Sequence, residues 1–409
     1  MNRVVVTGMG IISPIGNNIN DFWTNLKSGK NGITNITKFD TSDYKVSVAA
    51  EVSNFEPCEY MEKADARKRD LYTQYGLASA IQAVQDSGIV GKIEPEMFGV
   101  YFGSGIGGIN TFSDEVNKLT SKGPKRVSPF FIPMMIANIC AGEIAIKFGA
   151  KGSCLPMVTA CATSNNTIGE AYRAIKHGYM DAVIAGGAEA AITPVGIAGF
   201  SNMMALSNSN DPEEACCPFD KRRSGFVMGE GAGTLVLENY EHAVARGAKI
   251  YGEIVGYGSS CDAHHITAPD PDGNGGASSM KMAMKEADID GTESIYVNAH
   301  GTSTPLNDKT ETIVIKKALG EENAKKAIIS STKSMTGHML GAAGAVEAIA
   351  SILALKEGVV PPTIGFKEAD EECDLDYCFN KSQNRNIEYA LSNGLGFGGH
   401  NACVAFKKI

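Results

Sequence analysis

Short runs of β-branched and apolar residues alternate with longer stretches of helical periodicity along most of the chain. Residues 66–88 keep apolar residues at helical spacing and end at Gly88, a residue type that commonly follows a helix. Strands that alternate with helices of this length predict an α/β fold. Seven apolar runs predict the strands, at residues 3–8, 97–105, 181–187, 233–240, 295–301, 326–334 and 402–409.

Two stretches rich in alanine, glycine and serine, residues 161–178 and 337–358, resemble each other. Each follows a polar turn and ends in a Lys-x-Gly sequence. Small side chains allow backbones to approach closely, so both stretches predict helices that are buried on most sides. The two helices suggest a duplicated unit. Because no proline-rich or serine-rich linker divides the chain, we do not expect two separately folding units.

The composition excludes several classes of protein. The 409 residues are 43% hydrophobic and 20% charged, as in folded globular proteins. The net charge of -9 disfavours a general nucleic-acid-binding protein, which needs clustered Lys and Arg. Residues 1–16 lack the apolar core of a secretory signal, and the most apolar stretch, residues 343–355, is short and contains Glu347. We therefore expect a cytoplasmic protein that does not enter a membrane.

The cysteine spacing and the glycine motifs disfavour a metal site and a nicotinamide cofactor. None of the ten cysteines forms a Cys-x-x-Cys pair, and the adjacent His264 and His265 lack a third ligand, so we expect free thiols and no metal site. Two glycine patterns, at residues 103–108 and 394–399, fit a dinucleotide-binding loop in spacing alone. The first lacks the later acidic residue and the second lies almost at the C-terminus, so no nicotinamide cofactor is expected.

Polar residues at three predicted junctions between strands and helices are candidates for chemistry. Cys161 stands before the first small-residue helix, where free N–H groups and the helix dipole favour a thiolate. His300 ends a predicted strand, and Lys333 precedes His338 at the entry to the second small-residue helix. Each residue alone also fits an ordinary structural role, as a buried thiol, a capping histidine or a solvated lysine. Together they favour one Cys-His-His site.

Four segments together resemble one known family. The set is similar to the β-ketoacyl-acyl-carrier-protein synthases over essentially the whole chain, most of all to the synthase II type that elongates chains in bacterial type II fatty acid synthesis. The resemblance implies a thiolase-like α/β fold with five αβαβα layers and two pseudo-symmetric halves, in which residues 1–250 carry the nucleophile and residues 251–409 carry both histidines. The four segments are TACATS (159–164), NAHGTSTPLND (298–308), STKSMTGHMLGAAG (331–344) and GFGGHNACVAFKK (396–408).

The same resemblance implies an acyltransferase that performs a decarboxylative Claisen condensation. Cys161 would hold an acyl chain as a thioester, while neutral His300 and His338 would hold the carbonyl of malonyl-carrier protein as carbon dioxide leaves. Lys333 would keep His338 unprotonated, and Glu311 would be the acid beside this lysine. The remaining implied roles are an oxyanion N–H and a gate for Phe397, pantetheine binding for Thr302 and Thr304, and the wall of the acyl pocket for Ile106.

The implied partner is an acidic acyl carrier protein, which an acidic enzyme can bind only through a local basic patch. The carrier brings its own phosphopantetheine, so the resemblance implies no cofactor of the enzyme itself, and it implies a homodimer. Two basic runs are candidates for the patch, and each also fits a solvated helix face or loop. They supply Lys63, Arg67, Lys68, Arg69, Lys125 and Arg126.

Other functions on the same fold stay open at this point. A thiolase would need a second cysteine in a Cys-x-Gly setting, which Cys403 lacks, and a non-catalytic chain-length partner subunit would lack Cys161. A polyketide-type ketosynthase and a Cys-His hydrolase would keep such residues. The chain departs from the usual pattern at Gly394 and Leu395, where elongation synthases commonly carry Ser and Phe, which leaves the chain-length preference open.

Overall fold

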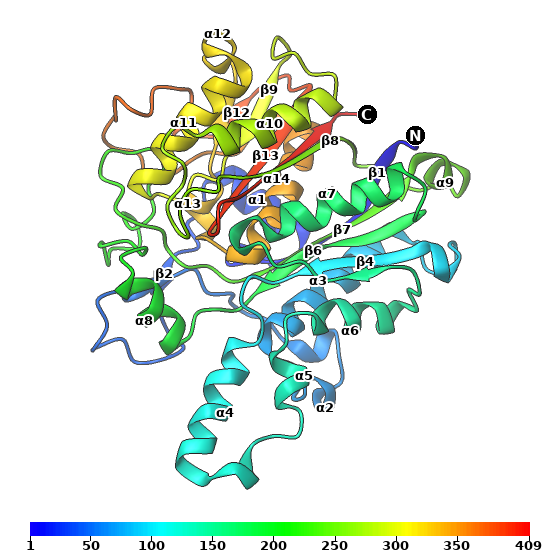
Figure 1. The fold of residues 1–409 in the computed structure, drawn as a ribbon, viewed down its shortest axis with the longest axis vertical. Helices are drawn as coiled ribbons and strands as arrows, with labels where there is room; N and C mark the ends of the chain where they lie inside the picture. The colour runs from blue at the N-terminus through cyan, green and yellow to red at the C-terminus, as the bar shows by residue number, and fades with distance from the viewer.

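Two buried helices, α7 (Thr163–Lys176) and α14 (Ala343–Glu357), lie at the centre of the computed structural model, which describes residues 1–409. A group of five strands covers each side of this helix pair, and further helices cover the outer face of each group, as Figure 1 shows. The layers therefore run α, β, α, β, α. The predicted α/β fold with five layers is confirmed.

The first group of strands forms a mixed sheet. β4 runs parallel to β5 and β6, whereas β7 runs antiparallel to β6 and β1. Helices α3 (Leu71–Ser87) and α6 (Ile139–Phe148) pack on its outer face, where Tyr72, Phe102 and Ile184 belong to one buried apolar cluster. In order across the sheet, the strands are β1 (Val4–Ile12), β7 (Gly231–Asn239), β6 (Ala182–Glu189), β4 (Phe98–Gly103) and β5 (Cys154–Leu155).

The second group of strands repeats this arrangement. Helices α10 (Asn274–Glu286) and α11 (Pro305–Leu319) cover its outer face. β9 runs parallel to β10 and β13, and β14 runs antiparallel to both of its neighbours. Pairing between β1 and β8 joins the two groups edge to edge. In order, the strands are β8 (Gly252–Cys261), β14 (His400–Lys407), β13 (Tyr389–Gly396), β9 (Ile295–Asn298) and β10 (Ile328–Ser330).

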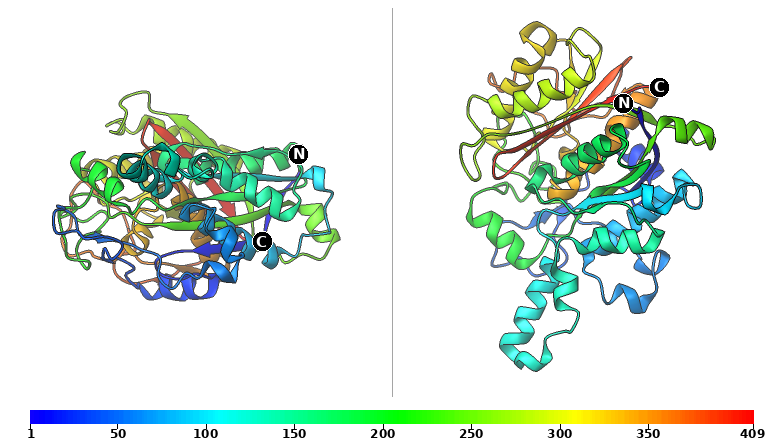
Figure 2. Two further views of the ribbon diagram at one scale, coloured as in Figure 1. Left: turned by 90° about the horizontal axis from the view of Figure 1, so that it is seen from below. Right: turned by 45° about the vertical axis from the view of Figure 1, so that its right-hand side comes forward.

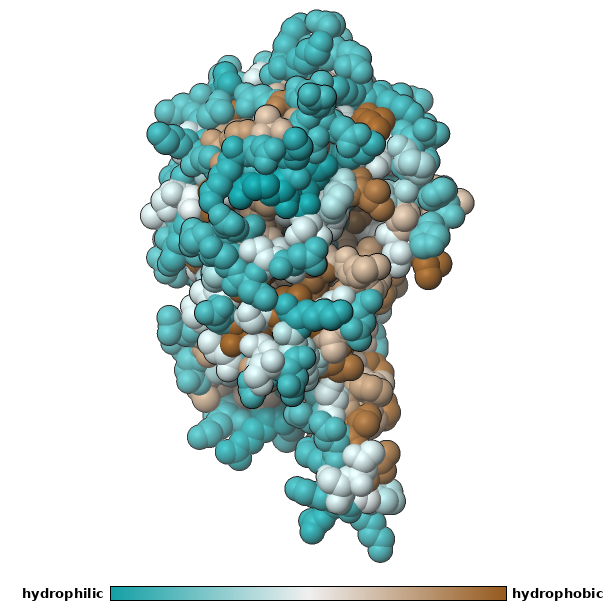
Figure 3. Space-filling view, turned by 90° about the vertical axis from the view of Figure 1, so that its left-hand side faces the viewer, coloured by the Kyte–Doolittle hydropathy of each residue, from teal (hydrophilic) through white to brown (hydrophobic).

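The remaining elements connect the layers or extend from them. Helices α4 (Ile109–Lys122) and α5 (Phe131–Met135) project from the body of the molecule (Figure 2). Phe112, Leu119 and Ile132 are exposed there, and Figure 3 shows hydrophobic atoms along one side of this projection. The helices are all too short or too polar to cross a membrane. The other elements are α1 (Ile19–Ser28), β2 (Thr34–Asn35), β3 (Val48–Ala49), α2 (Lys63–Ala66), α8 (Pro194–Asn202), α9 (Tyr240–Ala245), α12 (Glu321–Ala324), α13 (Lys333–Thr336), β11 (Val359–Val360) and β12 (Gln383–Asn384).

The structure differs from the sequence-based prediction in a few elements. All seven predicted strands are present, but the pattern does not predict β8 and β13, which contain glycine and serine in place of most β-branched residues. Both lie between two other strands, so neighbours on each side supply the pairing that their own composition does not indicate. The helix predicted at 66–88 begins at Leu71, after the capping residue Asp70, and the helix predicted at 337–358 begins only at Ala343.

Glycine in α7 allows this helix to lie directly against β8. A methyl group at Gly169 would come within 2.2 Å of the Tyr257 ring, far closer than the roughly 3.5–4.0 Å of a favourable carbon contact. The ring cannot move away, because Tyr257 is fully buried and its hydroxyl bonds Asn166 Oδ1 at 3.4 Å. A larger residue at this position would therefore push the central helix away from the sheet.

Gly169→Ala should lower the free energy of unfolding by about 1–3 kcal/mol, the usual effect of overpacking a core. Gly142→Ala in α6 is the matched control, because a methyl group there meets no atom within 4 Å. Removing that helical glycine should raise the free energy of unfolding by about 0.5–1 kcal/mol. Urea unfolding of both variants measures the difference, and shifts in the same direction would contradict this account of α7 packing.

Candidate active site

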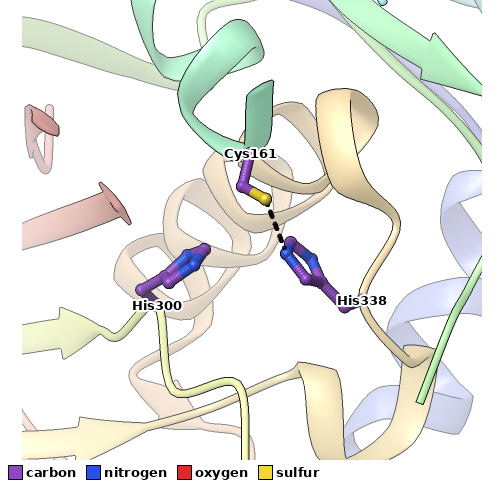
Figure 4. Close-up of side chains that lie close together, drawn as sticks. All are labelled: Cys161, His300 and His338. Atoms are coloured by element: carbon purple, nitrogen blue, oxygen red, sulfur yellow. Dashed lines mark hydrogen bonds between the residues drawn. The ribbon is translucent and has the colours of Figure 1, made fainter. Parts of the chain in front are cut away.

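Cys161 stands at the head of α7, in the 3-10 turn η4 (Ala160–Ala162). Ala160 has a left-handed backbone with φ of 50°, a conformation uncommon for residues other than glycine. The sharp turn directs the Cys161 side chain away from the helix axis and toward two histidines, as Figure 4 shows. The nucleophile candidate is therefore placed by a strained turn and not by the first regular turn of the helix.

The two histidines come from loops of the C-terminal half. His300 lies two residues after Asn298, the last residue of β9. His338 lies between α13 and a second 3-10 turn, η5 (Leu340–Ala342), and its main-chain N–H donates to the carbonyl of Val227 at 2.7 Å. That bond ties the His338 loop to the first half of the chain. His338 therefore precedes α14 in an extended segment, in contrast to the predicted position at the start of a helix.

The three side chains converge on one point (Figure 4). His338 Nε2 lies 3.0 Å from Cys161 Sγ, and the rings of His300 and His338 are 5.3 Å apart and nearly perpendicular, at 85°. One donor atom from each residue lies within 4.8 Å of the other two, and this is the only such group of His, Cys, Asp or Glu in the chain. Their types could hold a metal ion, so the expectation that no metal acts here stays a prediction.

A cavity of about 380 Å³ reaches these three residues and is lined from both halves of the chain. Exposed Met204 and Leu306 line it farther out, and Thr302 and Thr304 also line it, with their hydroxyl oxygens 2.9 Å apart. Ile106 does not line this cavity. Its side chain is 38% exposed on the turn that follows β4, so the expectation that Ile106 forms the pocket wall is not met within a single chain.

Burial raises the pKa of Cys161 to about 12, opposite to the direction expected from the helix end. The positive charge of Lys333 and the N–H of Phe397, which hydrogen-bonds the sulfur, lower this pKa, but the loss of hydration outweighs them. The resting residue is therefore a thiol. It needs a base for activation, and His338 Nε2 is within hydrogen-bonding reach.

The two histidines are neutral at pH 7. Burial, reinforced by the positive charge of Lys333, lowers the pKa of both His300 and His338 well below the usual value. No protein group bonds Nδ1 of either ring, so the tautomer of each ring is decided on its Nε2 side. At His338 that side faces the Cys161 thiol at 3.0 Å, where Nε2 accepts the S–H proton. A neutral ring can exchange its two tautomers, so Nε2 can donate an N–H when no thiol proton faces it.

Lys333 is buried and forms an ion pair with Glu347 of α14. Glu311 instead accepts hydrogen bonds from the main-chain N–H groups of His300 and Gly301, both at 2.7 Å. Glu347 is the ion-pair partner of Lys333, and the charge of Lys333 also lowers the pKa of Glu311, so the role of Glu311 as an acid near this lysine stays a prediction. Glu311 acts on the loop that holds His300, and burial raises the pKa of its carboxyl to about 7.

Phe397 and Leu395 line the cavity from β13 and the turn that follows it. The neighbouring Gly394 has a steric reason to be glycine. A Cβ atom there would lie 2.3 Å from Asn165 Oδ1 and 3.3 Å from the Cα of Ala162. Glycine in place of the usual serine therefore allows β13 to lie close to the turn that carries Cys161.

The predicted basic patch lies on two segments, one before α3 and one between α4 and α5. Lys68 Nζ lies 5.7 Å from the centre of the Phe130 ring, which brings the two segments together. Two of the six residues have carboxylate partners: Arg69 pairs with Glu143 at 2.7 Å and its side chain is only 16% exposed, and Lys68 lies 3.8 Å from Asp65. The exposed residues without a carboxylate partner are Lys63, Arg67, Lys125 and Arg126.

Three residues near the site, Glu347, Leu340 and Glu189, have no role there that the sequence predicts. A carboxylate in an otherwise apolar stretch is a sign of a buried ion pair, so the position of Glu347 in residues 343–355 carried a usable signal. Leu340 lines the cavity close to Cys161, and Glu189 binds the turn that contains Leu340. Neither residue stands out in the sequence, because a leucine and a strand-end glutamate are common in any fold.

Comparisons with known proteins identify the family. Residues 1–243 match the family described as Beta-ketoacyl synthase, N-terminal domain, and residues 251–367 match Beta-ketoacyl synthase, C-terminal domain. The 3-oxoacyl-(acyl-carrier-protein) synthase 2 of Staphylococcus aureus (strain COL) is 52% identical over 408 residues, which cover 100% of this chain and 98% of that protein. The protein of the same name from Vibrio harveyi is 50% identical over 409 residues, which cover 100% of this chain and 99% of that protein.

Solved structures match over the full length as well. A beta-ketoacyl synthase from Burkholderia phymatum STM815 has a TM-score of 0.93 at 34% identity, with 100% of both chains covered. A type II polyketide ketosynthase, solved in complex with its acyl-carrier protein, has a TM-score of 0.92 at 34% identity and covers 100% of this chain and 99% of its own. With matches to both domains of the family and relatives 50–52% identical over 98–99% of their length, the chain belongs to the beta-ketoacyl synthase family.

Proposed function

We propose that the protein elongates fatty acids by condensing an acyl chain with malonyl-acyl-carrier protein, with loss of carbon dioxide, to give 3-oxoacyl-carrier protein. One observation carries the proposal: the Cys161 thiol and the neutral imidazoles of His300 and His338 converge at one cavity. Identities of 52% and 50% to the synthases 2 of S. aureus and V. harveyi support it.

A polyketide-type ketosynthase is the second candidate, and it receives less support. The polyketide ketosynthase that resembles this chain is 34% identical, against 52% for the S. aureus synthase over a similar length. A non-catalytic chain-length subunit is disfavoured because Cys161 is present beside a base. The presence of two imidazoles and a buried lysine next to the thiol favours decarboxylation over simple thioester hydrolysis.

In the first half-reaction, the sulfur of Cys161 attacks the thioester carbonyl of acyl-carrier protein. His338 Nε2 takes the thiol proton as the carbon–sulfur bond forms. Main-chain N–H groups of Cys161 and Phe397 hold the oxygen of the tetrahedral intermediate, and one such donor is worth about 3–4 kcal/mol. When the intermediate collapses, the phosphopantetheine thiolate leaves with the proton from His338, and the acyl chain stays on Cys161.

In the second half-reaction, the thioester carbonyl of malonyl-carrier protein lies between the two rings. N–H groups of His300 and His338 stabilise the enolate that forms as the bond to the carboxylate breaks and carbon dioxide leaves. The enolate carbon attacks the thioester on Cys161, whose sulfur departs as a thiolate and is reprotonated. Lys333 assists because its positive charge disfavours protonation of either ring, and the phosphopantetheine of the carrier is the only prosthetic group in this scheme.

The proposed partners are an acyl carrier protein at the basic patch and a second copy of this chain. β5 is an edge strand whose residues Cys154 and Leu155 are exposed, with exposed Val158 nearby, and open apolar edges of this kind are usually covered. Ten free cysteines support a cytoplasmic location. We also propose that the two thiolase-like halves of the chain meet at residue 250, because β8, the first strand of the second group, begins at Gly252.

Cys161→Ala should reduce condensation by about 10³-fold or more, since it removes the nucleophile. Decarboxylation of malonyl-carrier protein should continue in this variant. His300→Ala should instead reduce decarboxylation by about 10²–10³-fold, the effect of losing one oxyanion donor. Release of labelled carbon dioxide and mass spectrometry of the carrier-bound product measure the two reactions.

Cys58→Ala and His264→Ala are the matched controls for these two variants. Both residues are exposed and lie outside the cavity, so both rates should stay at the level of the unmodified enzyme. A His300→Ala enzyme that decarboxylates at the unmodified rate would refute the proposed role of His300. Condensation by Cys161→Ala at the unmodified rate would remove the basis of the proposed function.

His300 and His338 should stay neutral at pH 6, where an imidazole with an ordinary pKa of about 6.5 is roughly three-quarters protonated. The reason is that burial and Lys333 lower the pKa of both rings, so protonation occurs only at lower pH. Imidazole signals of enzyme labelled with nitrogen-15 histidine, followed from pH 8 to pH 6, measure this. His300→Ala and His338→Ala assign the signals, and a midpoint near 6.5 for either ring would contradict the prediction.

The double variant Lys63→Ala/Lys125→Ala should raise the Michaelis constant for acyl-carrier protein by about 3- to 10-fold, because two charges near the proposed docking site are lost. The turnover number should change less than twofold. Lys281→Ala/Lys285→Ala on α10 is a control matched in residue type, exposure and lack of an ion pair. Equal effects of the two double variants would show that the basic patch does not bind the carrier.

A further inference from the structure

Glu189 is a buried carboxylate near the active site that the proposed condensation steps do not use. It ends β6 and has no exposed surface. Its four hydrogen-bond donors are all uncharged, so no cation balances this carboxyl group. Oε1 accepts from Ser104 Oγ at 2.9 Å and Ile106 N at 3.3 Å, and Oε2 accepts from Gly105 N at 2.8 Å and Gly341 N at 3.0 Å.

One of these donors, Gly341, has the same place in the second half of the chain that Cys161 has in the first half. Cys161 is the middle residue of η4, directly before α7, and Gly341 is the middle residue of η5, directly before α14. The residue before each is left-handed, with φ of 50° at Ala160 and 44° at Leu340. The two central helices thus begin with the same sharp turn, but only the first turn carries a reactive side chain.

The carboxylate of Glu189 and the turn after β4 fill the space that a side chain at position 341 would need. A Cβ atom on Gly341 would lie 2.3 Å from Gly105 N and 2.9 Å from Glu189 Oε2. Because Glu189 accepts the N–H of Gly341, a carboxyl oxygen of the protein lies at the second turn where the oxyanion would lie at the first. The duplicated turn is therefore closed from inside by the side chain of Glu189.

Leu340, the first residue of this closed turn, faces the cavity that contains Cys161. Leu340 lines the cavity and belongs to the same buried apolar cluster as Cys161. Its left-handed backbone is unfavourable for a leucine and persists only where neighbouring bonds hold it. The bond from Gly341 N to Glu189 is one of these, and the bond from Ser164 Oγ to the Gly341 carbonyl, at 2.5 Å, is another.

We propose that Glu189 is a positioning residue for acyl transfer, which holds the Leu340 turn so that the Leu340 side chain forms the wall of the acyl cavity beside Cys161. This inference rests on the proposed function, and it names a residue that affects the transfer of the acyl chain to Cys161. Glu189 makes no hydrogen bond to His300 or to its loop. His338 lies two residues before Leu340, but its main chain is held separately, by its N–H to the Val227 carbonyl at 2.7 Å and by the Gly229 N–H to its own carbonyl at 2.9 Å. The decarboxylation step should therefore depend on Glu189 much less than acyl transfer does.

Glu189→Gln is the direct test, because the amide keeps the size of the side chain but turns one acceptor oxygen into an N–H₂ group. That group would face two N–H or O–H donors and lose their hydrogen bonds. The rate of acyl transfer from acyl-carrier protein to Cys161 should fall by about 10- to 100-fold, as expected for a small displacement of a substrate-binding wall. Decarboxylation of malonyl-carrier protein by the same preparation should stay within about twofold of the unmodified rate, since His300 lies on another loop and the main-chain bonds to Val227 and Gly229 still hold His338.

Glu238→Gln is the matched control. Glu238 is also fully buried and lies near the opposite end of the paired strands β6 and β7, where it bonds Thr7 and Arg246. This variant should lose stability but keep the ratio of acyl transfer to decarboxylation. A Glu189→Gln enzyme with the unmodified ratio would overturn the inference, as would an equal change of ratio in Glu238→Gln.

Leu340→Ala tests the inference without touching the buried carboxylate, in case Glu189→Gln does not fold. It should change the dependence of acyl transfer on chain length, measured with a graded series of acyl-carrier proteins, and leave decarboxylation within about twofold. An unchanged chain-length profile would overturn the inference. Failure of the unmodified enzyme to form 3-oxoacyl product would instead overturn the proposed function, so the two failures are distinguishable.

Discussion

Close contact between the N-terminal ends of α7 and α14 is the constraint on which the rest of the structure depends. A methyl group at Gly344 would lie 2.0 Å from Asn165 Oδ1, so the two backbones meet with no room for a side chain. The bond between Ser164 Oγ and the Gly341 carbonyl closes the same contact. Larger residues here would separate the helices, and with them Cys161 from His338, which lie on opposite sides of this contact.

Burial of the site at this contact decides its electrostatics. In water, a thiol at a helix end becomes more acidic, but here the loss of hydration dominates and raises the pKa of Cys161. The same loss of hydration lowers the pKa of His300 and His338, and the charge of Lys333 adds to that effect. A thiol beside neutral imidazoles suits a reaction that needs first a base and then two N–H donors. Glu347 makes a buried lysine tolerable, because an unpaired buried charge is strongly destabilising.

In each half of the chain, a buried glutamate accepts hydrogen bonds from two successive main-chain N–H groups of a loop that follows a strand. The turn after β4 presents two successive N–H groups, from Gly105 and Ile106, to Glu189, and the loop after β9 presents those of His300 and Gly301 to Glu311. Burial raises the pKa of both carboxyls to about 7. In one half the carboxyl holds the loop of His300, and in the other it holds a turn with glycine at the position that cysteine has in the first half. The two halves therefore share a backbone arrangement and differ in the side chains that it carries.

The sequence by itself determined the α/β class, the two small-residue helices and the candidate residues Cys161, His300 and His338, because periodicity and junction residues are local properties. Only the tertiary structure decided that Glu347 pairs with Lys333, that Ile106 stands outside the cavity and that β8 and β13 are strands. It also reversed the expected shift in the pKa of Cys161, since hydration depends on which segments cover a residue. His338 lies 177 positions from the sulfur that it contacts, and no pattern among nearby residues reports a contact formed by packing over that distance.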